Sequence, residues 1–292
     1  IGAVCKHNPL DTIMTAIFPP LGNWEPTRQT LHRCALAVSV VPRAHAVPHP
    51  KWWHIALLAQ PDGLRTREIA LPDGGSFNLF MDLTGHTIQI HQGENRIPVV
   101  EITPGLTGTH IGEAVISAVS GLGLEGRYAR EKFEDGEAGQ YDPQAASAFL
   151  QAVNLAQKVF AKHRAALSGE TGPIQLWPHG FDLAFEWFGT KQISYEEHGE
   201  TFQTPAQLNL GFSLGEPGHP EPYFYSNPWP FAGELLTAQA LPPGASWYTN
   251  SWQGSLLPYA ALAGDPLGPQ RLFEYAQRVF ALASPTLMNS SI

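Results

Sequence analysis

The sequence has few cysteines, few cations and no long apolar run. Its 292 residues include two cysteines, Cys5 and Cys34, so at most one disulfide can form and a reducing compartment is expected. The 17 Lys and Arg residues are outnumbered by 26 Asp and Glu and nowhere form a run of three, which argues against nucleic-acid binding. No apolar stretch approaches the roughly 20 residues that cross a bilayer, and the N-terminus lacks the pattern of a signal peptide. We therefore expect a soluble cytoplasmic protein that binds neither nucleic acid nor membrane.

The composition is that of a folded protein with many turns. Apolar residues make up 43% of the chain and charged residues 15%, outside the range of disordered chains. The 26 prolines and 28 glycines stand in short clusters and not in one low-complexity tract, which favours short strands joined by turns. Cys34 lies in an apolar stretch, so we interpret it as a small buried hydrophobe and not as a nucleophile.

Alternating apolar residues predict two groups of strands. The first group covers residues 31–40, 52–59, 76–83, 86–92 and 97–102. The later strands of this group are joined by Thr84-Gly85 and by Gly93-Glu94-Asn95, which suit antiparallel hairpins because no crossover helix fits in so few residues. The second group covers residues 181–188, 206–214 and 222–227, with a weaker signal at 245–252.

Three segments change to the helical period. Residues 111–119 are apolar at every third or fourth position and end at Gly121. Asp142-Pro143 supplies an N-cap and a first-turn proline for a long helix that we expect to reach Leu167. Pro269 opens a last amphipathic helix.

The sequence therefore predicts an α+β fold of mainly antiparallel sheets, with a long connecting helix and a C-terminal helix. We expect residues 14–140 to form a sheet and helix, and residues 141–292 to form the long helix, the second sheet and the last helix. One alternative is that both parts form a single compact unit. Because each half places strands first and a helix last, a pseudo-duplication of the two halves is a further hypothesis.

Two motif matches lack the structural context that gives such motifs their function. GLGLEG at 121–126 has the letters of a dinucleotide-binding loop, but the predicted helix precedes the glycines and does not follow them. GFSLG at 211–215 has the letters of a nucleophile elbow around Ser213, but the prolines that follow prevent the helix that this motif needs. We keep a serine esterase only as the weaker alternative.

The 12 histidines show no spacing typical of metal ligands, and no cofactor is implied. His32 and His54, on early predicted strands, could converge with His179. A histidine on an apolar face is, however, more often hydrogen-bonded in the core. We therefore predict no metal site.

The stretch WPHGFDLAFEWF, residues 177–188, places Asp182 and Glu186 on one face of a predicted strand. Four residues of extended chain separate their carboxylates by about 13 Å. This exceeds the ~5 to 9.5 Å that paired glycosidase carboxylates span, so neither acid can serve the other as partner. Glu221 is the better partner for Asp182, since Glu221, Tyr223 and Tyr225 share one strand parity.

Several motifs taken together resemble a known family. They are W-x-x-T-x-x-T-L-H from Trp24 to His32, then WWH, WPHGFDLA, GFS, PEPYFY and LLPYAAL. In this order they resemble the bacterial domain-of-unknown-function family numbered 5996, over residues 20 to about 285. The resemblance implies a single family unit and a cytoplasmic bacterial protein, and it implies no activity. It also makes Met14 the expected natural start and residues 1–13 an extension. Some members carry a histidine where this chain has AQLNL, a departure that weakens a histidine-centred metal model.

Three functions agree with these residues. The first is a small-molecule hydrolase, with saccharides among its candidate substrates, that uses Asp182 and Glu221 as acid and base, assisted by His54 or His179. The second is a binding module in which the same aromatics hold a small ligand or a partner chain without catalysis. The third is structural, with the aromatics in the core and the acids at loops or in solvent. The candidate ligand-binding residues are Trp53, Trp177, Tyr223, Tyr225, Trp229 and Trp252.

Overall fold

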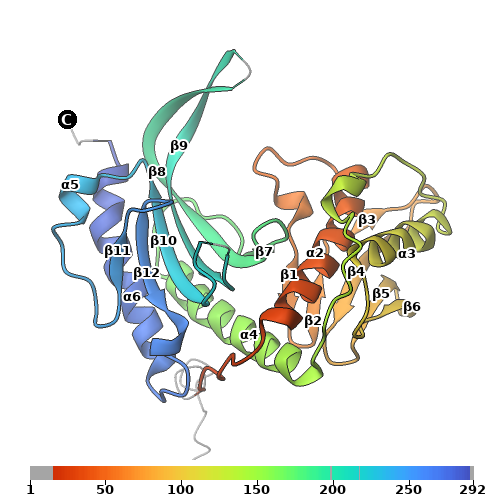
Figure 1. Cartoon of the computed structure of the whole chain (residues 1–292). Coiled ribbons are helices and arrows are strands. Elements are labelled where there is room, and N and C mark those ends of the chain that lie inside the picture. Colours follow the sequence, from red (N-terminus) through yellow and green to blue (C-terminus); the bar gives the residue numbers. More distant parts are fainter. Residues whose placement is uncertain (1–15, 198, 217, 290–292) are drawn as a thin grey trace, which may run out of the picture. The chain divides into compact units, whose positions relative to one another are not determined.

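The computed structural model describes residues 16–197, 199–216 and 218–289 (Figure 1). These residues form two compact units. The N-terminal unit comprises residues 21–154 and 175–182, and the C-terminal unit comprises residues 16–20, 155–174 and 183–289. The expected extension, residues 1–13, lies outside the described residues, as does Cys5.

The N-terminal unit contains an antiparallel sheet of six short strands, in the order β1-β2-β4-β5-β6 with β3 beside β4. Helices α2 and α3 pack against each other, α3 contacts β6, and α2 contacts β3 and β4 (Figure 1). The helices are α2 (Glu25–His45), α3 (Gly108–Ser120) and the first half of α4 (Pro143–Ala165), with the 3-10 helices η1 (Trp53–Ile55) and η2 (Arg130–Lys132). The strands are β1 (Leu58–Gln60), β2 (Gly63–Arg65), β3 (Ile69–Ala70), β4 (Ser76–Asp82), β5 (Thr87–Gln92), β6 (Asn95–Glu101) and β7 (Gln175–Trp177).

The prediction of a strand at residues 31–40 was wrong, because this segment lies inside helix α2. Pro26 stands in the first turn of α2, where its missing N–H is not needed. Toward its C-terminal end α2 is buried on nearly every side, since all residues from 37 to 42 are inaccessible. A helix that is buried on all sides has no alternation of apolar and polar faces with the helical period. Its apolar run can therefore be mistaken for a strand. His32 is therefore not a strand residue. Of the strand predicted at residues 52–59, only Leu58 and Ala59 belong to a strand, β1.

The other predicted elements are present, although β2, β3 and β7 were not predicted. Thr84-Gly85 joins β4 to β5, Gly93-Glu94 joins β5 to β6, and both pairs are antiparallel. Helix α3 ends at Gly121, and Asp142 caps α4 by accepting the N–H of Gln144 at 2.9 Å. Helix α6 begins at Gly268 with Pro269 in its first turn. The α+β class with antiparallel sheets is thereby confirmed.

The C-terminal unit is built on a second antiparallel sheet in the order β11-β12-β10-β9-β8. Strands β8 and β9 continue beyond the sheet as a long twisted hairpin (Figure 1). No helix in the described parts of the chain is both long and apolar enough to cross a membrane. The strands are β8 (Asp182–Glu197), β9 (Glu200–Ser213), β10 (Tyr223–Trp229), β11 (Ser246–Tyr248) and β12 (Gly254–Pro258). The helices are the second half of α4, α5 (Gly233–Leu236) and α6 (Gly268–Ala283), with the 3-10 helices η3 (Tyr259–Ala261) and η4 (Ser284–Leu287).

The two faces of this second sheet differ in character. One face carries fully buried apolar side chains such as Phe185, Phe212 and Phe224, and helix α6 contacts strands β9 and β10. Phe160 of α4 packs on this face, with its ring centroid 6.1 Å from that of Phe185. The opposite face is partly exposed and mixes aromatic with polar side chains: Glu186, Ser213 and Tyr223 are buried, whereas Asn209 and Tyr225 are partly exposed. The site described next lies on this second face.

Candidate functional site

Strand register aligns the residues of the partly exposed face in rows across β8, β9 and β10. Glu186 pairs with Asn209, and Asn209 pairs with Asn227. In the next row, Gly211 of β9 pairs with Tyr225 of β10. One row further, Ser213 pairs with Tyr223. Residues two apart in a strand share a face, so this face presents polar side chains beside aromatic ones.

Three aromatic rings from this face form one cluster. The centroid of Trp252 lies 6.1 Å from Tyr223 and 6.2 Å from Tyr225, and the two tyrosine rings are 6.2 Å apart. Tyr248 extends the cluster, with its ring 4.6 Å from Trp252. These separations are those of favourable ring pairs. Tyr225, Tyr248 and Trp252 are each partly exposed, so the cluster has an accessible surface.

Backbone and polar contacts fix these rings. Gly211 allows the Tyr225 ring to lie over strand β9, because a Cβ at Gly211 would stand 2.5 Å from the Tyr225 hydroxyl oxygen. The Tyr223 hydroxyl donates to Glu216 Oε1 at 3.1 Å, and the ring of His219 meets Tyr223 edge-on at 4.7 Å. Of the predicted ligand-binding residues, the structure brings Tyr223, Tyr225 and Trp252 together. Trp229 lies on the same strand but has no ring contact with them among the described residues.

The polar row beside the aromatic cluster contains a buried acceptor without a partner. Asn209 Oδ1 is buried and accepts no hydrogen bond from any described residue. Asn227, on the neighbouring strand, donates through Nδ2 to the carbonyl of Gln253 at 2.6 Å. Buried polar atoms are nearly always hydrogen-bonded, so Asn209 Oδ1 is suited to a donor that the protein itself does not supply.

The predicted residues His54, Trp53, Trp177 and His179 all lie in the N-terminal unit. A backbone bridge between Leu57 and Leu176 brings their two segments together. His54 is buried, and its Nδ1 accepts the backbone N–H of His49 at 3.1 Å. The ring of Trp177 meets that of His179 at 5.8 Å, and His179 is exposed.

Arg67 joins the same two segments through its guanidinium group. It donates to the carbonyls of Trp53 and Ala56 at 2.5 and 3.2 Å, and to Gln175 Oε1 at 2.8 Å. Burial and then the charges of Arg43, His49 and Arg67 lower the pKa of His54. His54 is therefore neutral near pH 7, with Nε2 as the N–H donor of its ring, since Nδ1 accepts a bond.

The two predicted acids fall in different units. Asp182 is the first residue of β8 and is assigned to the N-terminal unit, whereas Glu221 lies in an exposed bend before β10 in the C-terminal unit. The acid and base roles of Asp182 and Glu221, and the assistance of His54 or His179, therefore stay predictions. Glu221 is not part of strand β10, so its parity with Tyr223 does not place it on the aromatic face.

Neither motif match has the context that its chemistry requires. Ser213 ends β9, and its Oγ accepts the N–H of Gly215 at 3.3 Å. The described residues after it form a loop and a bridge between Glu216 and His219, with no helix before β10. GLGLEG follows helix α3 and is followed by loop. Cys34 is fully buried, and burial raises the pKa of its thiol to about 12, as expected of a structural cysteine.

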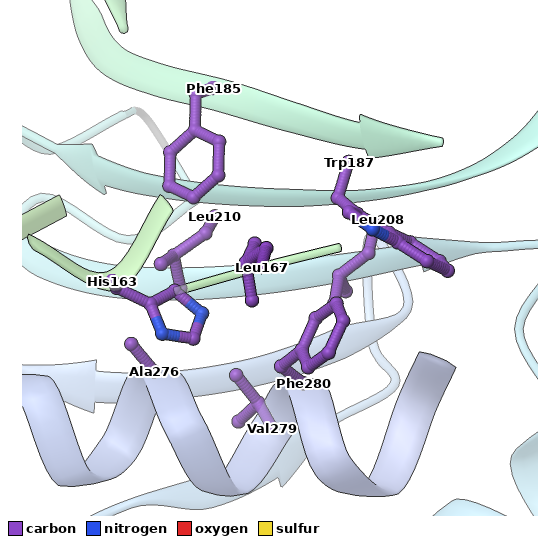
Figure 2. Close-up of a pocket in the computed structure, with 9 residues that line it drawn as sticks. All are labelled: His163, Leu167, Phe185, Trp187, Leu208, Leu210, Ala276, Val279 and Phe280. Carbon is purple, nitrogen blue, oxygen red and sulfur yellow. The ribbon is translucent and has the colours of Figure 1, made fainter. Parts of the chain in front are cut away.

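A small cavity lies elsewhere in the C-terminal unit, between α4, the sheet and α6 (Figure 2). Its volume is about 10 Å³, which is the space of one water molecule. Its lining is apolar apart from His163, whose ring meets Phe280 edge-on at 5.9 Å. This cavity is a packing defect of the core and is too small for a substrate. In the described residues, no group of three or more His, Cys, Asp or Glu is placed to hold a metal ion.

The sequence analysis missed residues of the aromatic face in the C-terminal unit and residues around His54 in the N-terminal unit. Asn209 and Gly211 could have been found, since strand parity in AQLNLGFS places them on the face of Ser213. The hydrogen bond between Arg67 and Gln175 joins residues that are 108 positions apart in the sequence, so no local sequence pattern could predict it.

Comparison with known proteins gives one match. The model of a family of unknown function (DUF5996) matches residues 18–288, so the chain belongs to this family. No curated protein and no solved structure matches the chain.

Proposed function

We propose that this family member binds a small, neutral, hydroxylated ring compound of the saccharide class on the aromatic face of its C-terminal unit. The observation that carries the proposal is the cluster of the partly exposed Tyr225 and Trp252 with the buried Tyr223, beside the acceptor Asn209 Oδ1, which no described residue satisfies. Ligand sites combine aromatic walls with a few placed polar groups, and this face has both.

The chemistry of the ligand follows from the two kinds of group. The Trp252 indole offers a flat apolar surface on which the ring of a sugar can lie. Asn209 Oδ1 needs a donor, and a hydroxyl group is a small neutral donor that also accepts from amide N–H groups. A purely apolar ligand would leave Asn209 unsatisfied, at a cost of about 1–3 kcal/mol.

We propose binding without catalysis, because the contacts on this face support a ligand site and do not bring the two predicted acids together. Hydrolysis by Asp182 and Glu221 is the catalytic extension, and it needs the two carboxylates to approach within ~5 to 9.5 Å. A cytoplasmic location is part of the same proposal, supported by the free, fully buried thiol of Cys34.

The test is calorimetric titration of the full chain with a panel of neutral methyl glycosides and disaccharides. We expect at least one saturable ligand, and at least tenfold weaker binding in Trp252→Ala and Asn209→Leu, because each removes about 1.4 kcal/mol or more of binding free energy. Tyr195→Ala is the matched control, since Tyr195 stacks on Phe202 of the same strand pair away from the cluster.

Two results would count against the proposal. The first is an absence of saturable binding by every glycoside of the panel. The second is an equal loss of affinity in Tyr195→Ala and Trp252→Ala, which would indicate a general effect of removing an aromatic ring. Analysis of the bound glycoside for cleavage products separates the catalytic extension from simple binding.

A further inference from the structure

Two arginines of the N-terminal unit lie beside residues 52–54, and neither has a carboxylate partner among the described residues. The guanidinium carbon of Arg43 lies 5.1 Å from the centroid of the Trp52 ring. Arg67 donates to two carbonyl oxygens and one amide oxygen, all of which are neutral. Neither arginine forms an ion pair within the residues that the structure describes. Two positive charges therefore act on this segment without local compensation.

Buried donors without acceptors accompany these charges. Arg43 Nε, Trp53 Nε1 and Gln175 Nε2 are all buried, and none donates a hydrogen bond to a described residue. Gln175 is completely inaccessible, and its other amide atom accepts from Arg67 at 2.8 Å. Each unsatisfied buried donor costs about 1–3 kcal/mol, so three donors around one segment need an explanation.

The backbone and rings of the segment are held in an unusual arrangement. Trp52 has φ 59°, a left-handed conformation that is rare for a bulky residue, and 53% of it is exposed. Its ring stacks on His54 at 5.6 Å, and the ring of Trp53 stacks on His49 at 4.3 Å. Strained conformations of this kind are retained where a function needs them.

From these contacts we infer that Arg43, Arg67 and His54 form a site for the anionic group of a small ligand, a carboxylate or a phosphate. The site supplies guanidinium donors suited to planar anions and the Nε2–H of a neutral histidine. An anion there compensates both arginine charges, and its oxygens accept from guanidinium N–H groups, whereas the completely inaccessible Gln175 Nε2 stays outside the site.

A purely structural role explains only part of the arrangement. Arg67 does link Trp53, Ala56 and Gln175, and Arg43 in the last turn of α2 interacts favourably with the helix dipole. Neither role uses Arg43 Nε, Trp53 Nε1 or Gln175 Nε2. The site involves only N-terminal residues and does not depend on the saccharide proposal.

The experiment is titration of the full chain with inorganic phosphate and, separately, with benzoate, at constant ionic strength held by sodium chloride. Calorimetry gives the affinity, and the thermal midpoint gives an independent reading because a ligand of the native state raises it. We expect saturable binding of one probe, with phosphate and benzoate distinguishing the two anion sources. Arg43→Gln and Arg67→Lys should each weaken that binding at least tenfold.

Arg96→Gln is the control, since Arg96 is exposed and bonds only to the carbonyls of its own hairpin turn. Circular dichroism checks folding. If Arg67→Lys does not fold, Arg43→Gln carries the test, because the Arg43 side chain forms no hydrogen bond with a described residue that the substitution would break. The proposal is overturned if neither anion saturates, or if Arg43→Gln binds as well as Arg96→Gln does. Neutral glycosides and Trp252→Ala report on the other unit, so failure of one proposal does not imply failure of the other.

Discussion

His163 is a titratable side chain inside an apolar core. It is 4% exposed, and the rings of Phe185, Phe273 and Phe280 meet its imidazole edge-on within 6.4 Å. Burial lowers the pKa of His163 from 6.5 to about 4. The folded protein therefore keeps this ring neutral at pH values where the unfolded chain would protonate it.

The pH dependence that follows has a definite sign. Between pH 6.5 and about 4 the unfolded state binds a proton that the folded state does not, so stability falls as the pH falls through this window. Above pH 6.5 the contribution is constant. We expect wild type to lose up to roughly 3 kcal/mol more than His163→Leu between pH 7 and pH 4. Urea unfolding of both proteins at the two pH values measures this difference, and parallel losses would contradict it.

A substitution at Gly211 should change the position of the Tyr225 ring. An added methyl group would meet the Tyr225 ring, which is a side chain and can move, whereas at Gly254 it would meet the backbone carbonyl of Ser226. We therefore expect Gly211→Ala to cost little stability but to displace Tyr225, and Gly254→Ala to destabilise the fold strongly.

The measurements for Gly211→Ala are the urea midpoint and the affinity for the glycoside found by titration. We expect a change in unfolding free energy of about 1 kcal/mol or less, with glycoside binding weakened several-fold. Gly136→Ala serves as the control because its added methyl group meets open space. Unchanged glycoside affinity in Gly211→Ala would separate Tyr225 from the binding site.

At the scale of elements, a buried hydroxyl network joins helix α6 to the second sheet. The Tyr275 hydroxyl lies 2.8 Å from Ser255 Oγ and donates to the Ser255 carbonyl at 3.0 Å, and Ser226 Oγ lies 2.7 Å from Ser255 Oγ. Tyr275 and Ser255 are completely inaccessible. Tyr275→Phe therefore removes a hydrogen-bond partner of the buried serine hydroxyl groups. We expect it to lower the free energy of unfolding by about 1–3 kcal/mol.

Chemical denaturation of Tyr275→Phe with an unchanged m-value would give this cost directly. Ser226→Ala and Ser255→Ala, singly and with Tyr275→Phe, form double-mutant cycles that show whether the three hydroxyls act as a unit. If the single losses simply add, the three groups contribute independently and the network description is wrong.

Elements with a polar face were the easiest to predict from the sequence. Strand β5 and helices α3 and α6 each have one more exposed side, so their period is visible in the residues, whereas residues 77–81 of β4 are all buried. The buried end of α2 shows only an apolar run, and its alternation suggested a strand. The aromatic half of the candidate site follows from parity within β10, whereas Arg67 and Gln175 meet only through the fold.

At the scale of the whole molecule, the protein has a formal net charge of −9, whereas the site proposed around Arg43 and Arg67 is locally positive. The 17 Lys and Arg residues are too few and too scattered to compensate an extended polyanion. Arg43 and Arg67 are only partly exposed, so the proposed site is better suited to a small anion than to the backbone of a duplex. The proposed site should therefore select anions by size.

Competition between anions tests this selectivity. We expect inorganic phosphate to bind saturably, and a labelled DNA duplex at 50 mM salt neither to bind the protein nor to displace phosphate, because long-range repulsion opposes the duplex and is only partly screened at this salt. Fluorescence anisotropy of the duplex and calorimetry with phosphate in its presence are the two measurements. Binding of the duplex that weakens steeply with salt and is lost in Arg43→Gln would instead mean that these arginines form part of an exposed phosphate-binding surface.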